Sequence, residues 1–353
     1  MIEADEAWEA IVVRIVEREL GSAVARIEPL AAGLGLRRFY RVTTAGDPSS
    51  VIARVEASED PAGRPSDTPP EPPLEPLRSF LERQGLPVPA RLGGDAERGI
   101  ELLEDLGSRT LASAVAGATP GERVALYTAA IDLIPRLQRL EDPAGELPAF
   151  RRRLDGALFD YKAELFARWS LPMALGREPL PSEVDAVRGA FRWIAAEALA
   201  APHRLAHRDY QSQNLHLCRD GRGGERLVMI DLQGAFLAPP EYDLVCLLRD
   251  SYVELPEDEV AWHLERVRPA LPDSPDAESF ARRFDLLTLT RKGKDHARFV
   301  YAASERGERR FARHLSTTAR ALRTAVARAA FLDPSLARLA EMIQRLLEST
   351  CAE

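Results

Sequence analysis

With 353 residues the chain is long enough for two lobes, and its 45% hydrophobic and 29% charged residues are typical of a globular protein. A net charge of -8 excludes broad binding to a nucleic-acid backbone, which needs a basic surface, but not the binding of one nucleotide. The three cysteines lack paired spacing, and the chain starts with acidic residues rather than with a signal-like segment. It also lacks a long apolar run, so we predict a cytoplasmic protein without membrane spans.

The first hundred residues are rich in predicted strands. Runs of β-branched and aromatic residues alternate there with turn-forming Gly, Pro and Asp. We expect strands over residues 37–44, 51–55, 88–92 and 99–103, and helices over 6–20 and 77–83. The stretch 58–76 is crowded with Pro, Asp and Glu and is predicted to be an exposed loop, because proline interrupts helices and inner strands.

The rest of the chain has mainly helical periodicity. Helical patterns cover residues 121–140, 150–169, 183–200, 256–268 and most of 280–348. The change falls near Leu103-Glu104-Asp105-Leu106-Gly107. An α+β fold with two lobes is therefore predicted, a small β-rich lobe over 1–106 and a larger, mainly helical lobe over 107–353.

The chemistry-bearing motif is His207-Arg208-Asp209 followed by Asn214. This is the spacing of a kinase catalytic loop. A carboxylate at Asp209 would accept or orient the proton of an attacking hydroxyl. The amide oxygen of Asn214 would bind a divalent metal without adding negative charge. We place His207 and Arg208 in the catalytic set with Asp209, and expect His207 to orient the loop by hydrogen bonds rather than to perform acid-base chemistry.

A second acid follows at the end of a predicted hairpin. Leu215 to Leu217 and Leu227 to Ile230 read as two strands around a polar turn, and Asp231 and Gln233 come directly after the second strand. A carboxylate leaving an apolar strand opposite Asn214 suits the metal ligand that bridges nucleotide phosphates.

Several residues of the first lobe are candidates for contacts to a nucleotide. Gly33 and Gly35 fit either a phosphate-covering loop or an ordinary turn, and Arg37 and Arg38 would face either phosphate or solvent. Arg54 lies within the predicted strand 51–55, where it would bind nucleotide phosphates or face solvent. If Arg54 has an acidic partner on the first lobe's helix, Glu75 and Glu82 are the candidates.

These motifs resemble those of the aminoglycoside phosphotransferase-like kinases, which have the two-lobed protein-kinase-like fold. The interval from Asp231 to Asp243 is too short for the activation segment of a protein kinase. Within the family the chain looks like the bacterial anomeric kinases of N-acetylmuramate and N-acetylglucosamine. The matching segments are residues 37–42, 102–107, 207–210, 231–233 and 242–252.

The resemblance implies a cytoplasmic kinase that uses ATP and Mg²⁺ to phosphorylate an amino sugar in cell-wall recycling. It further implies that Asp243 braces the catalytic loop, that Gln233 supports it, and that the segment Leu102 to Leu106, with Glu104 and Leu106, contacts adenine. No nucleic-acid or membrane partner is expected, and the oligomeric state stays open.

Two alternatives remain. One is a kinase for an aminoglycoside, choline or another sugar. A cationic acceptor needs acids near the site, for which the sequence offers Glu241, Asp250, Glu254, Glu257 and Asp258. The other is a pseudokinase, against which the intact Asp209, Asn214 and Asp231 argue.

Overall fold

The computed structural model describes residues 2–30, 37–56, 72–142, 144–219 and 224–350. The chain forms two compact units. We call Met1–Pro72, Pro87–Arg109 and His216–Ile230 the sheet unit, and Pro73–Leu86, Thr110–Leu215 and Asp231–Glu353 the helical unit. The predicted lobes meet at one boundary after residue 106. In the structure, by contrast, the segments Pro73–Leu86 and His216–Ile230 each belong to the other unit.

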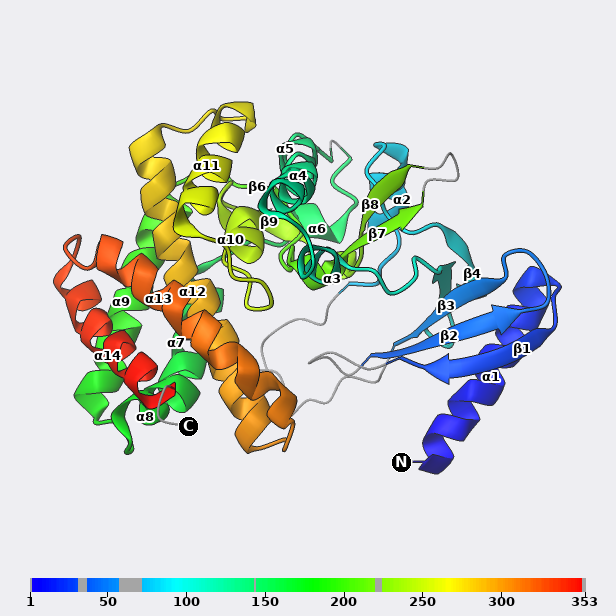
Figure 1. The fold of residues 1–353 in the computed structure, drawn as a ribbon, viewed down its shortest axis with the longest axis horizontal. Coiled ribbons are helices and arrows are strands. Elements are labelled where there is room, and N and C mark those ends of the chain that lie inside the picture. The colour runs from blue at the N-terminus through cyan, green and yellow to red at the C-terminus, as the bar shows by residue number, and fades with distance from the viewer. Residues whose placement is uncertain (1, 31–36, 57–71, 143, 220–223, 351–353) are drawn as a thin grey trace. The chain divides into compact units, whose positions relative to one another are not determined.

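The sheet unit is a five-stranded antiparallel sheet with one helix and a hairpin (Figure 1). Its strand order is β1-β2-β3-β5-β4. The elements are α1 (Ile2–Leu20), β1 (Val24–Pro29), β2 (Arg38–Thr44), β3 (Ser50–Val55), β4 (Arg91–Asp95), β5 (Ile100–Glu104), β7 (Leu215–Arg219) and β8 (Glu225–Met229). The edge strand β1 was not predicted, because its residues are exposed or only half buried and show no alternation.

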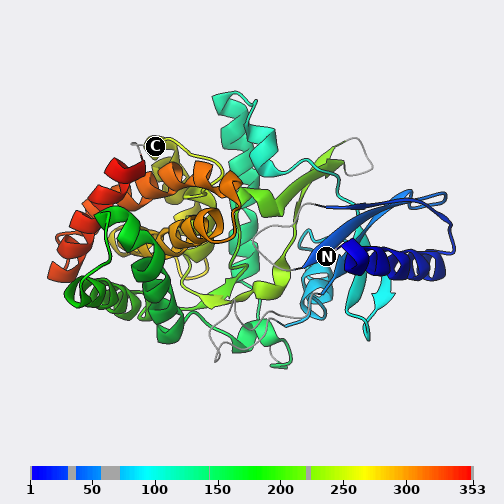
Figure 2. The same ribbon diagram turned by 90° about the horizontal axis from the view of Figure 1, so that it is seen from below.

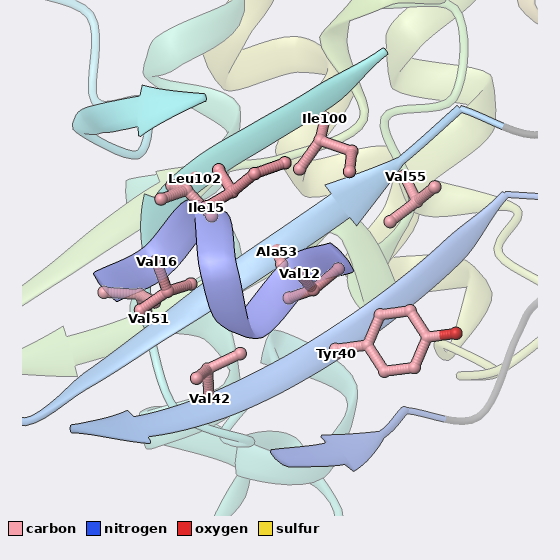
Figure 3. Close-up of a cluster of buried hydrophobic side chains, with 10 residues drawn as sticks. All are labelled: Val12, Ile15, Val16, Tyr40, Val42, Val51, Ala53, Val55, Ile100 and Leu102. Atoms are coloured by element: carbon pink, nitrogen blue, oxygen red, sulfur yellow. The ribbon is translucent and has the colours of Figure 1, made fainter. Parts of the chain in front are cut away.

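One face of this sheet is covered by α1 (Figure 3). Val12, Ile15 and Val16 recur at helical spacing and pack on alternate residues of the three central strands. These strand residues are Tyr40, Val42, Val51, Ala53, Val55, Ile100 and Leu102, all at most 2% exposed. Full burial of each large aliphatic side chain stabilises the fold by about 2 kcal/mol, so α1 is an integral layer of the unit.

The helical unit contains most of the helices. They are α2 (Leu77–Arg83), α3 (Leu111–Val115), α4 (Pro120–Ile131), α5 (Leu133–Gln138), α6 (Pro148–Arg151), α7 (Gly156–Leu165), α8 (Leu171–Leu175), α9 (Pro181–Leu199), α10 (Tyr242–Leu248), α11 (Glu257–Val267), α12 (Ala277–Ser304), α13 (Leu315–Ala329) and α14 (Pro334–Thr350). A π-helical turn, Phe166–Ser170, joins α7 to α8. Among the described residues, none of the helices is both long and apolar enough to span a membrane.

The long helix α12 organises this unit. It packs against α7, α9, α10 and α13, and α14 packs on α8, α9 and α13. Figure 2 shows the orange and red C-terminal helices lying side by side. Helical periodicity runs through most of residues 280–348, but in the structure the helix is interrupted twice within this range. The first break is at Gly307, whose φ of +67° is left-handed, and the second precedes Pro334.

Candidate active site

Two short strands bring the predicted motifs together. β6 (Arg204–Ala206) pairs antiparallel with β9 (Phe236–Ala238), and Ala206 lies opposite Phe236. The loop that leaves β6 carries His207 to Asn214, and the loop that enters β9 carries Asp231 and Gln233. Because the end of one antiparallel strand lies beside the start of its partner, both loops emerge at the same edge. Asp209 and Asp231 are thus placed on neighbouring loops of the helical unit.

The start of the catalytic loop is held by Asp243, in the first turn of α10. Its carboxylate accepts hydrogen bonds from the backbone N–H of His207 at 2.7 Å and of Arg208 at 3.1 Å. Arg208 has a φ of +79°, an uncommon conformation for a residue with a side chain. Burial raises the pKa of Asp243 to about 6, against the opposing effect of His207 and the two N–H groups. The buried carboxylate therefore fixes a strained turn just before Asp209.

The other end of the loop is anchored as well. Buried Asp250 accepts a hydrogen bond from the backbone N–H of Ser212 at 2.7 Å and another from the Ser212 hydroxyl. The side-chain amide of Asn214 donates to the backbone carbonyl of Asp209 at 2.9 Å. Since the amide nitrogen is occupied in this way, the oxygen of Asn214 is the atom left to bind a metal.

Asp209 has a cationic partner from a distant part of the chain. Nη2 of Arg291, on α12, donates to Oδ1 of Asp209 at 2.7 Å. Burial alone would raise the pKa of Asp209. The positive charges of Arg291, Lys294 and Arg208 outweigh burial and hold that pKa well below its usual range. Asp209 is consequently ionised at any physiological pH and is ready to accept a hydrogen bond.

Asp231 lies in a left-handed turn, with a φ of +64°. The side-chain amide of Gln233 donates to its Oδ1, and the backbone carbonyl of Gln233 accepts from Arg152 at 3.4 Å. One carboxylate and one amide oxygen suit Mg²⁺, which prefers oxygen ligands and retains several waters. A cluster of three or more His, Cys, Asp and Glu, such as a protein-only cage needs, is not found in the described residues.

The structure corrects the expected partner of Arg54. This arginine is only 3% exposed and lies on the face of β3 opposite α1. It pairs with Glu101, its cross-strand neighbour, at 2.6 Å, and with Glu56 two residues along β3. The prediction of Glu75 or Glu82 was wrong, because Arg78 on α2 pairs with both of those acids.

Other candidates of the sheet unit have local partners. Arg37 donates to Glu56 at 3.1 Å, and Arg38 begins β2 opposite Val55. Glu104 ends β5, pairs with Arg226 of the β7–β8 hairpin and accepts the Ala90 N–H at 3.2 Å. Gly33 and Gly35, and most of the predicted loop 58–76, lie outside the described residues.

The segment after β5 is fixed by Asp105. Arg41 donates to both of its carboxylate oxygens, at 2.7 and 3.1 Å, and Gly107 donates its N–H at 2.9 Å. Leu102 and Leu103 pair with strands on both sides, so much of their backbone is engaged in the sheet. The two residues predicted to contact adenine lie at the end of the strand and just after it, and Glu104 is half-buried and Leu106 buried.

Sequence reasoning missed the cations of α12. Arg291, Lys292 and Lys294 lie about 80 residues after Asp209 and carry no recognised motif. A signal was nevertheless present, since these two lysines are among only three in the chain. Asp250, which the sequence offered as an acid for a cationic substrate and as part of the region near the sugar, is bonded to Ser212 in the structure.

Comparison with known proteins agrees with this geometry. Residues 26–284 match the profile of the phosphotransferase enzyme family. The chain belongs to this family. The N-acetylmuramate/N-acetylglucosamine kinase of Pseudomonas aeruginosa is 32% identical to it over 91% of this chain and 89% of that protein. The kinase of the same name from Neisseria meningitidis is 30% identical over 89% of each chain.

Solved structures share the fold. Choline kinase LicA from Streptococcus pneumoniae has a TM-score of 0.57 at 17% identity, covering 89% of this chain and 99% of that one. An aminoglycoside phosphotransferase in complex with gentamicin has a TM-score of 0.56 at 14% identity, covering 90% and 95%. The predicted two-lobed, protein-kinase-like α+β fold is thereby confirmed, and the protein is a phosphotransferase.

Proposed function

We propose that this phosphotransferase uses ATP to phosphorylate the anomeric hydroxyl of N-acetylmuramate or N-acetylglucosamine. The proposal rests on the environment of Asp209. Arg291 keeps its carboxylate ionised, and Asp243 holds the loop that carries it. The relatives named for these two sugars support the choice of acceptor. Because ATP is the donor, we place the reaction in the cytoplasm.

Asp209 would act mainly by orientation. A carboxylate whose pKa is held so low is a weak base, so it accepts a hydrogen bond from the sugar hydroxyl without removing the proton early. Phosphoryl transfer has a loose transition state in which the attacking hydroxyl needs little activation. The proton would pass to Asp209 late, as the new O–P bond forms.

Asn214 and Asp231 would hold Mg²⁺ through the amide and carboxylate oxygens of the two neighbouring loops. When bound, the metal neutralises charge on the nucleotide phosphates. Gln233 would keep the Asp231 carboxylate oriented through its hydrogen bond. His207 and Arg208 would shape the loop, and Asp243 would support it.

The sheet unit would bind the nucleotide, and the helical unit would bind the acceptor. We assign the phosphates to Arg37, Arg38 and the glycines Gly33 and Gly35, and the adenine edge to Glu104 and Leu106. Arg54 would act through the pair with Glu101, stiffening the face of the sheet opposite α1.

A cationic acceptor is disfavoured by the charges of the helical unit. The acids that such a substrate would need are already engaged with cations or backbone N–H groups. Glu241 pairs with Arg283, Glu254 with Arg320, and Glu257 with Arg249 and Arg328. Asp250 binds Ser212, and Asp258 accepts the Glu259 N–H. Three of the four charges that act on Asp209 are positive, Asp295 being the exception, and this excess would repel choline or an aminoglycoside.

A screen of ATP consumption tests the proposal. The purified protein with Mg²⁺ is offered N-acetylmuramate, N-acetylglucosamine, choline, ethanolamine and several aminoglycosides. We expect turnover only with the N-acetylated sugars. Turnover with choline or an aminoglycoside and none with either sugar would contradict the proposed acceptor, and the absence of turnover with every acceptor would favour a pseudokinase.

A further inference from the structure

Lysine is almost absent from this protein. Of the 47 Lys and Arg residues only three are lysines, namely Lys162, Lys292 and Lys294. All three belong to the helical unit, the first on α7 and the others on α12, and these two helices pack together. Every cation elsewhere in the chain is an arginine. An ammonium differs from a guanidinium in being compact and in losing its proton more readily when it is buried.

The three lysines differ in their partners. Lys292 is fully engaged, bonded to Asp295 at 2.8 Å and to Ser251 at 3.3 Å, and is 1% exposed. Buried Lys162 lies over the rings of Phe159 and Tyr242, at 5.0 and 5.2 Å. Its Nζ has no hydrogen-bond partner among the described residues.

Among the described residues, Lys294 has a single acidic neighbour at ion-pair distance, and it is a lysine whose charge acts on Asp209. Its Nζ is 3.4 Å from Asp295, and 12% of its side chain is exposed. It follows Arg291 by three residues, so it lies about 4.5 Å further along the same face of α12. Arg291 itself binds Asp209, and Lys294 is close enough to lower the pKa of that carboxyl.

Positive charge is in excess around Lys294. Arg291 and Arg298 act on it from the same helix, against Asp295 and Asp209. Burial and the two arginines lower its pKa to about 8, although both carboxylates oppose this. Asp295 is shared with Lys292 and Arg291, so it neutralises Lys294 only in part. One more negative charge beside Lys294 would reduce the repulsion between its ammonium and the two arginines.

We propose that Lys294, with Arg298 one turn further, binds a carboxylate carried by the acceptor sugar. The inference rests on the proposed function and makes the charged sugar, N-acetylmuramate, the acceptor that the site recognises specifically. This sugar differs from N-acetylglucosamine by a lactyl group, which is joined to the ring through an ether oxygen and ends in a carboxylate. With the anomeric hydroxyl at Asp209, we expect that carboxylate to lie against Lys294, which follows Arg291 by about one turn on the same face of α12.

The same cation has an alternative role, the binding of the transferred phosphate. The two roles predict different results with the two sugars. A phosphate ligand is used with either sugar, so its loss lowers kcat/KM equally for both. A carboxylate ligand is used with N-acetylmuramate alone, so its loss changes the ratio between the two sugars.

The test is steady-state kinetics of the Lys294→Met variant with both sugars. We expect kcat/KM for N-acetylmuramate to fall about tenfold to hundredfold more than that for N-acetylglucosamine, which loses only the effect of Lys294 on Asp209. Lys294→Arg should retain most of the preference. Arg282→Met, which removes an exposed cation near the start of α12, is the matched control and should change neither value.

A measurement on the wild type makes the test independent of folding. N-acetylmuramate whose carboxylate is converted to the amide should lose the same factor in kcat/KM as the variant shows. An equal loss on both sugars in Lys294→Met, or an amide as good as the acid, would overturn the inference and leave the sugar-kinase proposal intact. If the wild type phosphorylates neither sugar, the proposed function itself is wrong.

Discussion

At the scale of single residues, the site depends on carboxylates in opposite electrostatic states. Asp209 is surrounded by cations that lower its pKa, whereas Asp243 is buried against backbone N–H groups and its pKa rises. The first is suited to meet a substrate hydroxyl and the second to hold a loop. The sequence indicates that both acids matter. It does not reveal the cation that tunes Asp209, because Arg291 reaches it only through tertiary packing.

The raised pKa of Asp243 predicts how folding stability changes with pH. The pKa moves from 3.8 in a free side chain to about 6 in the folded protein, so folding favours the protonated form. This contribution is present below about pH 4 and is lost as pH rises through 6, a change of about 3 kcal/mol. Asp243→Asn removes it.

Urea unfolding at pH 4.5 and pH 7 checks this prediction. The free energy of unfolding of the wild type, relative to that of Asp243→Asn, should be lower at pH 7 than at pH 4.5. Asp285, whose pKa burial also raises to about 6, is present in both proteins and cancels in the difference. A difference that is independent of pH would contradict the assignment.

Lys294 predicts a pH effect that depends on the acceptor. Its pKa of about 8 is set by burial and by Arg291 and Arg298, against Asp295 and Asp209. Above that pH the ammonium loses its proton and with it the attraction for a carboxylate. The ratio of kcat/KM for N-acetylmuramate to that for N-acetylglucosamine should therefore fall between pH 7 and 9. In Lys294→Met this ratio should be low at both pH values.

At the scale of elements, sequence patterns predicted the larger parts of the sheet unit and missed the smallest parts of the helical unit. Periodicity identified β2 and β3 of the sheet unit, and α2 of the helical unit, within a residue or so, because their buried residues alternate or recur regularly. β6 and β9 have three residues each, too few for a period, yet they align the two catalytic loops. The break at Gly307 was missed since the apolar pattern continues beyond it.

The Arg54–Glu101 pair predicts a large stability effect within the sheet unit. Replacing Arg54 by Met leaves the largely buried Glu101 without its cation, whereas Glu56 keeps Arg37. We expect the free energy of unfolding to fall by about 3 kcal/mol and the KM for ATP to rise. Thermal melts and ATP titrations measure the two effects.

The control for this change is Arg26→Met on the edge strand β1. Arg26 also pairs with a glutamate, Glu28, but it is 69% exposed, so its loss should leave the melting temperature nearly unchanged. Equal effects of the two substitutions would show that burial does not distinguish the pairs. An Arg54→Met protein of normal stability would contradict the structural role given to Arg54.

At the scale of the whole molecule, the fold and the reaction class follow from a few local motifs, but the acceptor does not. His207 to Asn214 and Asp231 indicate phosphotransfer, and the short path to Asp243 excludes a protein kinase. The choice between a cationic and an anionic acceptor depends on the charge summed over helices distant in sequence. The sequence alone does not show this charge, because Arg291 and Lys294 act on Asp209 only through the packing of α12.

The most direct test of the account is the reaction of N-acetylmuramate and N-acetylglucosamine with ATP, catalysed by the wild type and by Asp209→Asn. Phosphorus NMR identifies the carbon that receives the phosphate. The account predicts a C1 phosphate from the wild type, and for the variant a kcat at least a thousandfold lower with unchanged nucleotide binding. Phosphate on another carbon, or a variant that retains a tenth of the wild-type kcat, would contradict it.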